Sequence, residues 1–136
     1  MPKALAPRLY YCEKENSLGN LWVIIMEYVA DVHMDTTTSD CEDIEVALKL
    51  LHNHKLIFGD LCRTNILCSA DGTKLVDFDW CDEEGKAFYP PGVNLRRDGN
   101  GKPIIAWHCD TGHGTQIKKE HDYHMFEILK KNHHHT

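Results

Sequence analysis

The stretch from Leu56 to Asp79, which reads LIFGDLCRTNILCSADGTKLVDFD, decides the fold of this chain. Within it, two short apolar runs at residues 66–68 and 74–76 flank a loop that contains Asp71-Gly72. Two apolar runs on either side of a glycine-containing loop predict an antiparallel hairpin. Pairing the two strands symmetrically about Asp71 then fixes which residues lie opposite one another.

Three oxygen-bearing side chains gather at the open end of this predicted hairpin. The symmetric register sets Asn65 opposite Asp77, and opposed residues in an antiparallel pair lie roughly 4.5–5.5 Å apart. Asp60 lies in the loop just before the first strand. Hard cations such as Mg²⁺ prefer carboxylate and amide oxygens, together with substrate phosphates. The stretch therefore predicts a magnesium site.

The order and spacing of these residues resemble the catalytic core of the protein-kinase-like superfamily, which has an Asp base, a metal-binding Asn and a metal-binding Asp. The local form Gly-Asp-Leu, Asn-Ile-Leu and Val-Asp-Phe-Asp-Trp is similar to kinase-like proteins of fungi. It is also similar to aminoglycoside and choline phosphotransferases, which place a Gly before the Asp. The resemblance implies ATP and Mg²⁺ as cofactors, and a hydroxyl of a protein or small molecule as the acceptor.

Carried over to this sequence, the resemblance assigns catalytic and metal-binding roles. Asp60 would orient the acceptor hydroxyl or accept its proton, and Asn65 and Asp77 would hold Mg²⁺ against the phosphates. Cys62 stands where the family often has Lys or His to neutralise the phosphoryl group. Arg63 is the residue expected to substitute for that positive charge.

The resemblance also assigns the residues that hold the nucleotide. Glu27 and Val29 would offer backbone groups to the adenine edge, as the family's hinge does, and Leu67 would pack under the adenine. Asp122 would accept hydrogen bonds from the backbone of the catalytic loop. An ordinary surface Asp in the first turn of a helix remains the alternative for Asp122.

The flanking segments predict the remaining elements. Residues 8–12 contain Leu9-Tyr10-Tyr11 and residues 21–26 are apolar and aromatic, which predicts a hairpin of two strands. Ser39 and Glu42 predict a capping box for a helix over 39–53. The last helix is expected over 118–131, with its apolar residues on one face. The helix over 39–53 is predicted from the helical spacing of its apolar residues Ile44, Ala47, Leu48 and Leu51.

The segment between the hairpin and the last helix, residues 80–116, is rich in Gly, Pro and Asp and predicts a long loop. A short strand or turn is expected at 104–107. Loops of this length in compact domains are usually functional, and by resemblance this one corresponds to the activation and substrate-recognition segment.

Taken together, the expected fold class is α+β, a single partial kinase-like domain over 1–136. Residues 8–29 would be the remnant strands and hinge of the small lobe, and 39–131 the large lobe. No Gly-x-Gly-x-x-Gly loop occurs in the sequence. The kinase family also has a Lys on a small-lobe strand, paired with a Glu on a helix, and neither residue can be placed in this chain. We therefore expect phosphoryl transfer to be weak or lost. The alternative is a non-catalytic pseudokinase that serves as a binding or scaffolding module.

Composition limits the other classes of function. The chain has 136 residues and a net charge of −6, with no basic stripe, so nucleic acid is not an expected partner. The longest apolar run, residues 21–30, is too short for a membrane span. The six cysteines form no Cys-x-x-Cys pair and read as reduced thiols of a cytoplasmic protein. Residues 21–29 are also expected to expose an apolar patch and an uncovered strand edge that support self-association.

A zinc-binding domain is a second alternative. Histidines are frequent, ten in 136 residues, and several lie close together near the carboxyl end. Their spacing is not that of a zinc finger. The candidate ligands are His108, Cys109, His113, His121 and His124.

Overall fold

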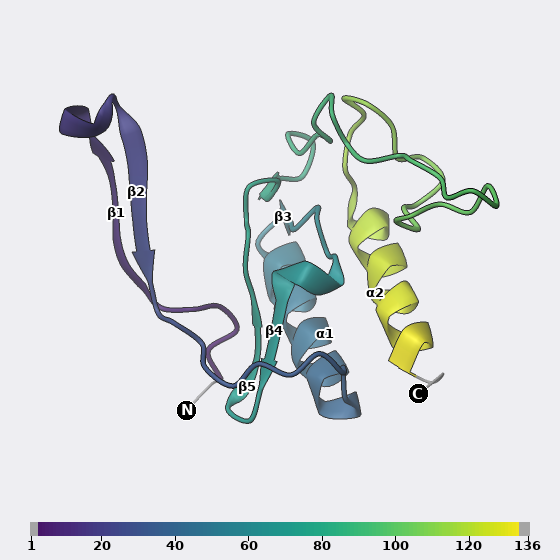
Figure 1. Ribbon diagram of the computed structural model, residues 1–136, viewed down its shortest axis with the longest axis horizontal. Coiled ribbons are helices and arrows are strands. Elements are labelled where there is room, and N and C mark those ends of the chain that lie inside the picture. Colours follow the sequence, from purple (N-terminus) through teal and green to yellow (C-terminus); the bar gives the residue numbers. More distant parts are fainter. Residues whose placement is uncertain (1–2, 134–136) are drawn as a thin grey trace.

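Helix α1, Thr38–Asn53, lies at the centre of the computed structural model, which describes residues 3–133 (Figure 1). Its apolar stripe is buried as predicted, with Ile44 and Leu48 fully inaccessible. The capping box predicted at Ser39 and Glu42 is wrong. Thr37 is the N-cap, and its side chain and the Asp40 side chain reciprocally bond each other's backbone N–H groups. The shorter Asp side chain reaches back from the third helical position as Glu does in the usual motif.

The predicted central hairpin is present, with strands β4, Ile66–Ser69, and β5, Gly72–Leu75. Its register differs by one residue from the symmetric pairing. Ser69 pairs with Gly72 and Ile66 with Leu75, so the connecting loop has two residues. Contacts with the start of α1 hold this register: the Thr73 hydroxyl donates to Asp40 Oδ1 at 2.5 Å, and the Thr73 N–H donates to the Asp43 carboxylate at 3.1 Å.

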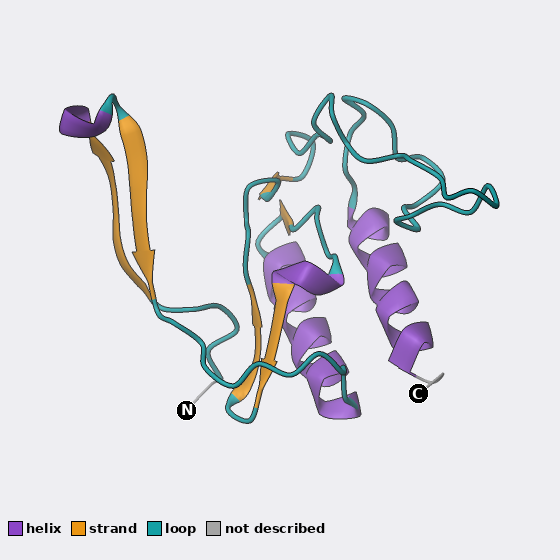
Figure 2. Cartoon of the chain, in the orientation of Figure 1, coloured by secondary structure: helices purple, strands orange, loops and turns teal. Residues whose placement is uncertain are grey.

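The second helix, α2, spans Lys119–His133 and packs beside α1 (Figure 2). Its buried residues Met125, Phe126 and Leu129 join the inner face of α1 and the hairpin in one apolar core. The remaining members of this core are Cys41, Ile44, Ala47, Leu48, Phe58, Leu61, Ile66, Cys68 and Leu75. The core thus joins the two helices to the segment before β4, where Asp60 lies.

The segment after the hairpin is largely irregular, as predicted, and is held by a second apolar cluster. Strand β3, Leu56–Ile57, pairs with the short strand β6, Asp82–Glu83. The cluster comprises Ile57, Ala87, Tyr89, Val93 and Ile117, with Trp80 and Trp107 packed against it. At 105–107 the chain forms a tight turn, in which the Trp107 N–H donates to the Ile105 carbonyl at 2.9 Å. The sequence had left open whether this segment is a turn or a strand.

Strands β1, Leu9–Glu15, and β2, Leu21–Met26, form the predicted amino-terminal hairpin, joined through a short 3₁₀ turn at Asn16–Leu18. The hairpin projects from the rest of the molecule (Figure 1). Most of its apolar side chains are exposed, including Trp22 at 66%. At its base the Glu27 carboxylate binds Lys74 Nζ at 3.0 Å from both oxygens, which links the hairpin to β5.

Within residues 3–133 the fold is therefore a mixed α+β arrangement of two helices and three small antiparallel sheets. Neither helix is long and apolar enough to cross a membrane.

Candidate functional site

The three residues predicted to form the magnesium site line one cavity. Asp60, Asn65 and Asp77 all face a cavity of about 600 Å³. The short 3₁₀ helix Arg63–Asn65 shapes one side of it. Other parts of the wall come from α2 and from the loop over 92–107. A cavity of this size is in the range that small-molecule sites occupy.

The position of Asp60 is fixed by a buried carboxylate on α2. Asp122 is 1% exposed, and it accepts hydrogen bonds from the N–H groups of Phe58 at 2.9 Å and Gly59 at 2.8 Å. The same carboxylate lies 2.8 Å from His52 Nε2 on α1. The backbone role predicted for Asp122 is confirmed, and the alternative of a surface Asp is wrong. The residue before Asp60 is thus clamped between both helices.

Gly59 is required at its position for two physical reasons. Its φ is +87°, a conformation that L side chains rarely adopt. A Cβ there would also lie 3.0 Å from Ile117 Cδ1 and 3.1 Å from the Trp80 carbonyl oxygen. The chain therefore turns sharply into Asp60 while the second apolar cluster packs against its backbone.

Asn65 and Asp77 do not oppose each other, which corrects the predicted register. The Val76 N–H donates to the Asn65 carbonyl at 2.9 Å, so Val76 occupies the position expected for Asp77. Asp77 follows with a φ of +61°, a left-handed conformation that redirects the chain as it leaves β5. The side-chain amide of Asn65 donates to the Asp60 carbonyl at 2.9 Å. The left-handed turn therefore keeps Asp77 on the cavity despite the shifted register.

Charge repulsion and burial act on the acidic end of this cavity. Burial raises the pKa of Asp60, and the negative charge of Asp77 raises it further. The Cys62 thiol donates to Asp60 Oδ1 at 3.2 Å, and burial together with the Asp60 charge raises the pKa of that thiol to about 12. Cys62 therefore stays a neutral hydrogen-bond donor. A bound cation would offset the repulsion between the two carboxylates.

Arg63 is held by backbone carbonyls. Its guanidinium donates to the carbonyl oxygens of His33 at 2.7 Å, Met34 at 2.8 Å and Ile66 at 2.6 Å. These bonds fasten the segment before α1 to the start of β4. Arg63 lines the cavity, but each of its three guanidinium nitrogens already donates to a backbone carbonyl, and a direct contact with a phosphoryl group stays a prediction.

The three residues predicted to hold the nucleotide lie outside this cavity. Leu67 pairs with Lys74 across the central hairpin, and Lys74 binds the Glu27 carboxylate. Opposed residues of an antiparallel pair project on the same side of the sheet, so Glu27 and Leu67 come to one face of the β4–β5 hairpin. Val29 follows two residues after Glu27 in the chain. The role of these three residues in binding adenine stays a prediction.

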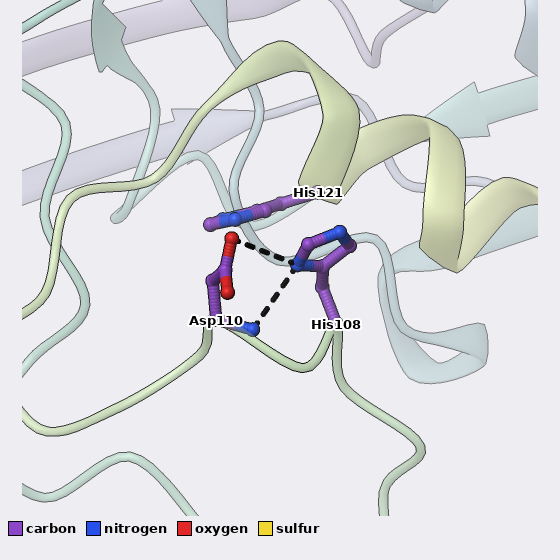
Figure 3. Close-up of side chains that lie close together, drawn as sticks. All are labelled: His108, Asp110 and His121. Carbon is purple, nitrogen blue, oxygen red and sulfur yellow. Dashed lines mark hydrogen bonds and ion pairs between the residues drawn. The ribbon is translucent and has the colours of Figure 1, made fainter.

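The histidines proposed as zinc ligands are partly brought together. His108 and His121 lie close to each other and to Asp110, which the sequence did not suggest (Figure 3). His124 is bonded to the Ala106 carbonyl at 2.8 Å, and His113 is exposed. Asp110 could have been found by its spacing, because it follows His108 by two residues.

Two tryptophans on the cavity wall were also missed as site residues. Trp80 and Trp107 lie with ring centroids 5.9 Å apart, and both line the cavity. Trp80 directly follows the Asp77-Phe78-Asp79 segment, so its place beside the site could have been inferred. Trp107 comes from the distant loop, and local sequence gives no sign of its position.

Comparison of the chain with protein-family models and with curated proteins finds no match in either.

Proposed function

We propose that this chain is a kinase-like phosphotransferase domain that binds a nucleotide with Mg²⁺ beside Asp60. The single observation that carries the proposal is the clamp of Asp122 on Phe58 and Gly59, which holds Asp60 on the same cavity as Asn65 and Asp77. Two carboxylates and an amide around one space are the ligands that Mg²⁺ prefers. The resemblance of the sequence to the kinase-like core supports the same assignment.

In this proposal each residue has a role that follows from its chemistry. Mg²⁺, when bound by Asn65 and Asp77, would neutralise phosphate charge. Asp60 would orient an acceptor hydroxyl and take its proton, helped by a pKa that burial raises. The tryptophan wall and the volume of the cavity favour an acceptor of small-molecule size. Positioning and charge neutralisation would supply most of the catalysis.

The second candidate is a pseudokinase that binds nucleotide without transferring phosphate. The observation that favours it is the bonding of Arg63, because Arg63 is the one basic side chain among the described residues that line the cavity. Its guanidinium donates to three backbone carbonyls. Phosphoryl transfer needs positive charge at the transferred group, and here that charge would have to come from the metal alone.

Calorimetric titration with ATP, with and without Mg²⁺, tests the proposal. We expect weak binding that depends on Mg²⁺. Asp77→Asn should abolish the Mg²⁺-dependent part, because Asn tolerates the left-handed backbone but lacks the charge. Asp60→Asn should retain it, since a base contributes to chemistry more than to binding. The matched control is Asp71→Asn, in the exposed hairpin loop, which should bind as the wild type does.

Turnover of ATP separates the two candidates. Slow turnover that is lost in Asp60→Asn would identify a phosphotransferase. Binding without turnover would identify the pseudokinase. Equal binding with and without Mg²⁺, or binding unchanged by Asp77→Asn, would contradict the site.

A further inference from the structure

A second cluster of ligand-type side chains lies apart from the magnesium site, where the long loop meets α2. His108 and Asp110 come from the loop, and His121 comes from the first turns of α2 (Figure 3). One nitrogen of each ring and one carboxylate oxygen lie within 4.8 Å of one another. His108 Nδ1 is 3.8 Å from an Asp110 oxygen, and the Asp110 N–H donates to that nitrogen at 3.2 Å.

His121 supplies an independent indication that a ligand belongs here. Its side chain is 1% exposed, and its Nε2 atom is buried with no hydrogen-bond partner in the part of the chain that the structure describes. An unsatisfied buried polar atom costs about 1–3 kcal/mol, and such atoms in native proteins often mark an ion or water. The ring extends over the Asp110 carboxylate (Figure 3).

The neighbours of His121 orient its ring as outer partners orient metal ligands. His121 Nδ1 accepts a hydrogen bond from the Lys118 N–H at 3.4 Å and lies 3.3 Å from the Tyr89 hydroxyl, which accepts a bond from Thr111 at 3.2 Å. The ring also contacts those of Tyr89 and His108, with centroids 5.7 Å and 4.5 Å away. Both polar contacts engage Nδ1, so Nε2 is the nitrogen that remains for a metal, and a metal bound there would displace the Nε2 proton.

We propose that His108, Asp110 and His121 bind one zinc ion, which fastens the long loop to α2. Two imidazoles and a carboxylate are a common zinc ligand set, and three protein ligands leave a fourth position open. Tetrahedral zinc with bonds of about 2.0–2.1 Å needs ligand atoms about 3.4 Å apart, so side-chain movements of about 1 Å complete the site.

The fourth position has a candidate ligand beside it. The thiol of Cys109 lies 3.9 Å from His108 Nδ1 and 3.8 Å from Asp110 Oδ1. Rotation of this exposed side chain would bring a thiolate to the metal. Otherwise water fills the position. His124, whose Nε2 is bonded to the Ala106 carbonyl, does not belong to this group of ligand atoms.

Zinc titration of the full chain, followed by calorimetry and by thermal unfolding, tests this proposal. His133, His134 and His135 are first replaced by Gln in every protein, so that the terminal run does not bind the metal. We expect one zinc per chain and a higher Tm with zinc, because a ligand that binds only the folded state stabilises it. Asp110→Asn and His108→Gln should each weaken binding about tenfold or more.

The matched control is His113→Gln, an exposed histidine of the same loop, which should bind zinc as the wild type does. Asp77→Asn should also bind normally, which separates this site from the magnesium site. Asp110 is exposed, so its variant tests the site even if a histidine variant fails to fold. No zinc binding, binding unchanged in both Asp110→Asn and His108→Gln, or equal loss in His113→Gln would overturn the proposal.

Discussion

At the residue scale, Asp122 has the greatest influence on the site although it does not line the cavity. Its carboxylate is the shared acceptor for two backbone N–H groups and lies against His52, so both helices and the segment before Asp60 meet at one buried charge. A carboxylate that accepts several hydrogen bonds is costly to replace, because each donor is then left buried without a partner.

We predict that Asp122→Ala lowers the free energy of unfolding by about 3 kcal/mol. The reason is that the Phe58 and Gly59 N–H groups lose their acceptor inside the core. Urea denaturation followed by circular dichroism measures the change. Glu120→Gln, on the exposed side of the same helical turn, serves as control and should change stability by less than about 0.5 kcal/mol. Equal stability of Asp122→Ala and wild type would contradict the role given to this residue.

At the element scale, the first turn of α1 fixes both the helix and the register of the central hairpin. Thr37 caps the helix, and Asp40 receives bonds from Thr37 and from Thr73 of β5. Burial alone would raise the pKa of Asp40, but these hydrogen bonds outweigh it and lower that pKa. The same carboxylate therefore joins helix capping to strand pairing.

We predict that Thr37→Ala destabilises the protein by about 1 kcal/mol, the usual cost of losing a cap. Ser39→Ala, the cap that the sequence suggested, should be close to neutral.

Asp40→Asn should destabilise the protein at pH 7. Because the folded pKa of Asp40 is lowered, its stabilisation is fully present above its ordinary value of 3.8 and is lost progressively as pH falls from that value through the lower folded pKa. Chemical denaturation at pH 7 and pH 3 measures both effects. A difference between Asp40→Asn and wild type that persists unchanged at pH 3 would contradict this account.

The two helices, the two hairpins and the long loop could be predicted from the sequence, because each has a local signal, whereas the short β3–β6 pair was not predicted. The helices follow from their apolar spacing, and the long loop from its Gly, Pro and Asp content. The hairpin register could not be predicted, since contacts of Thr73 with α1 decide it, and those come from distant sequence. For the same reason the sequence suggested His108 and His121 as ligands but gave no sign that the long loop brings His108 and Asp110 together beside His121.

In the candidate site, too, some features have a local sequence signal and others depend on contacts between distant parts of the chain. Asp60 and Asn65 have fixed offsets within one stretch, and Asp122 was recognised by resemblance. The left-handed turn at Asp77, which restores it to the cavity, depends on how the chain leaves β5 and not on any residue pattern. Trp107 reaches the cavity only through packing of the long loop.

At the scale of the whole molecule, the β1–β2 hairpin is the part least covered by the rest. Trp22, Ile24 and Ile25 are each more than half exposed on β2. Contiguous exposed apolar surface marks a site of association, and a strand with an uncovered edge offers backbone groups for pairing.

We predict that the protein self-associates in a concentration-dependent way through this hairpin. Ile24→Lys combined with Ile25→Glu should give a monomer, because charges on the strand oppose pairing. Val46→Lys, at an exposed position of α1, is the control and should associate as the wild type does. Light scattering over a range of concentrations measures the mass. A wild-type monomer at high concentration would mean that the hairpin does not associate.

The central claim is that a metal–nucleotide complex binds beside Asp60. Its most direct test is paramagnetic broadening in NMR spectra with Mn²⁺·ATP, since Mn²⁺ accepts the oxygen ligands that suit Mg²⁺. The account predicts strong broadening of the amide signals of Asp60, Asn65 and Asp77, lost in Asp77→Asn. Broadening confined to the region of His108 and His121, or no broadening around Asp60 at all, would contradict it.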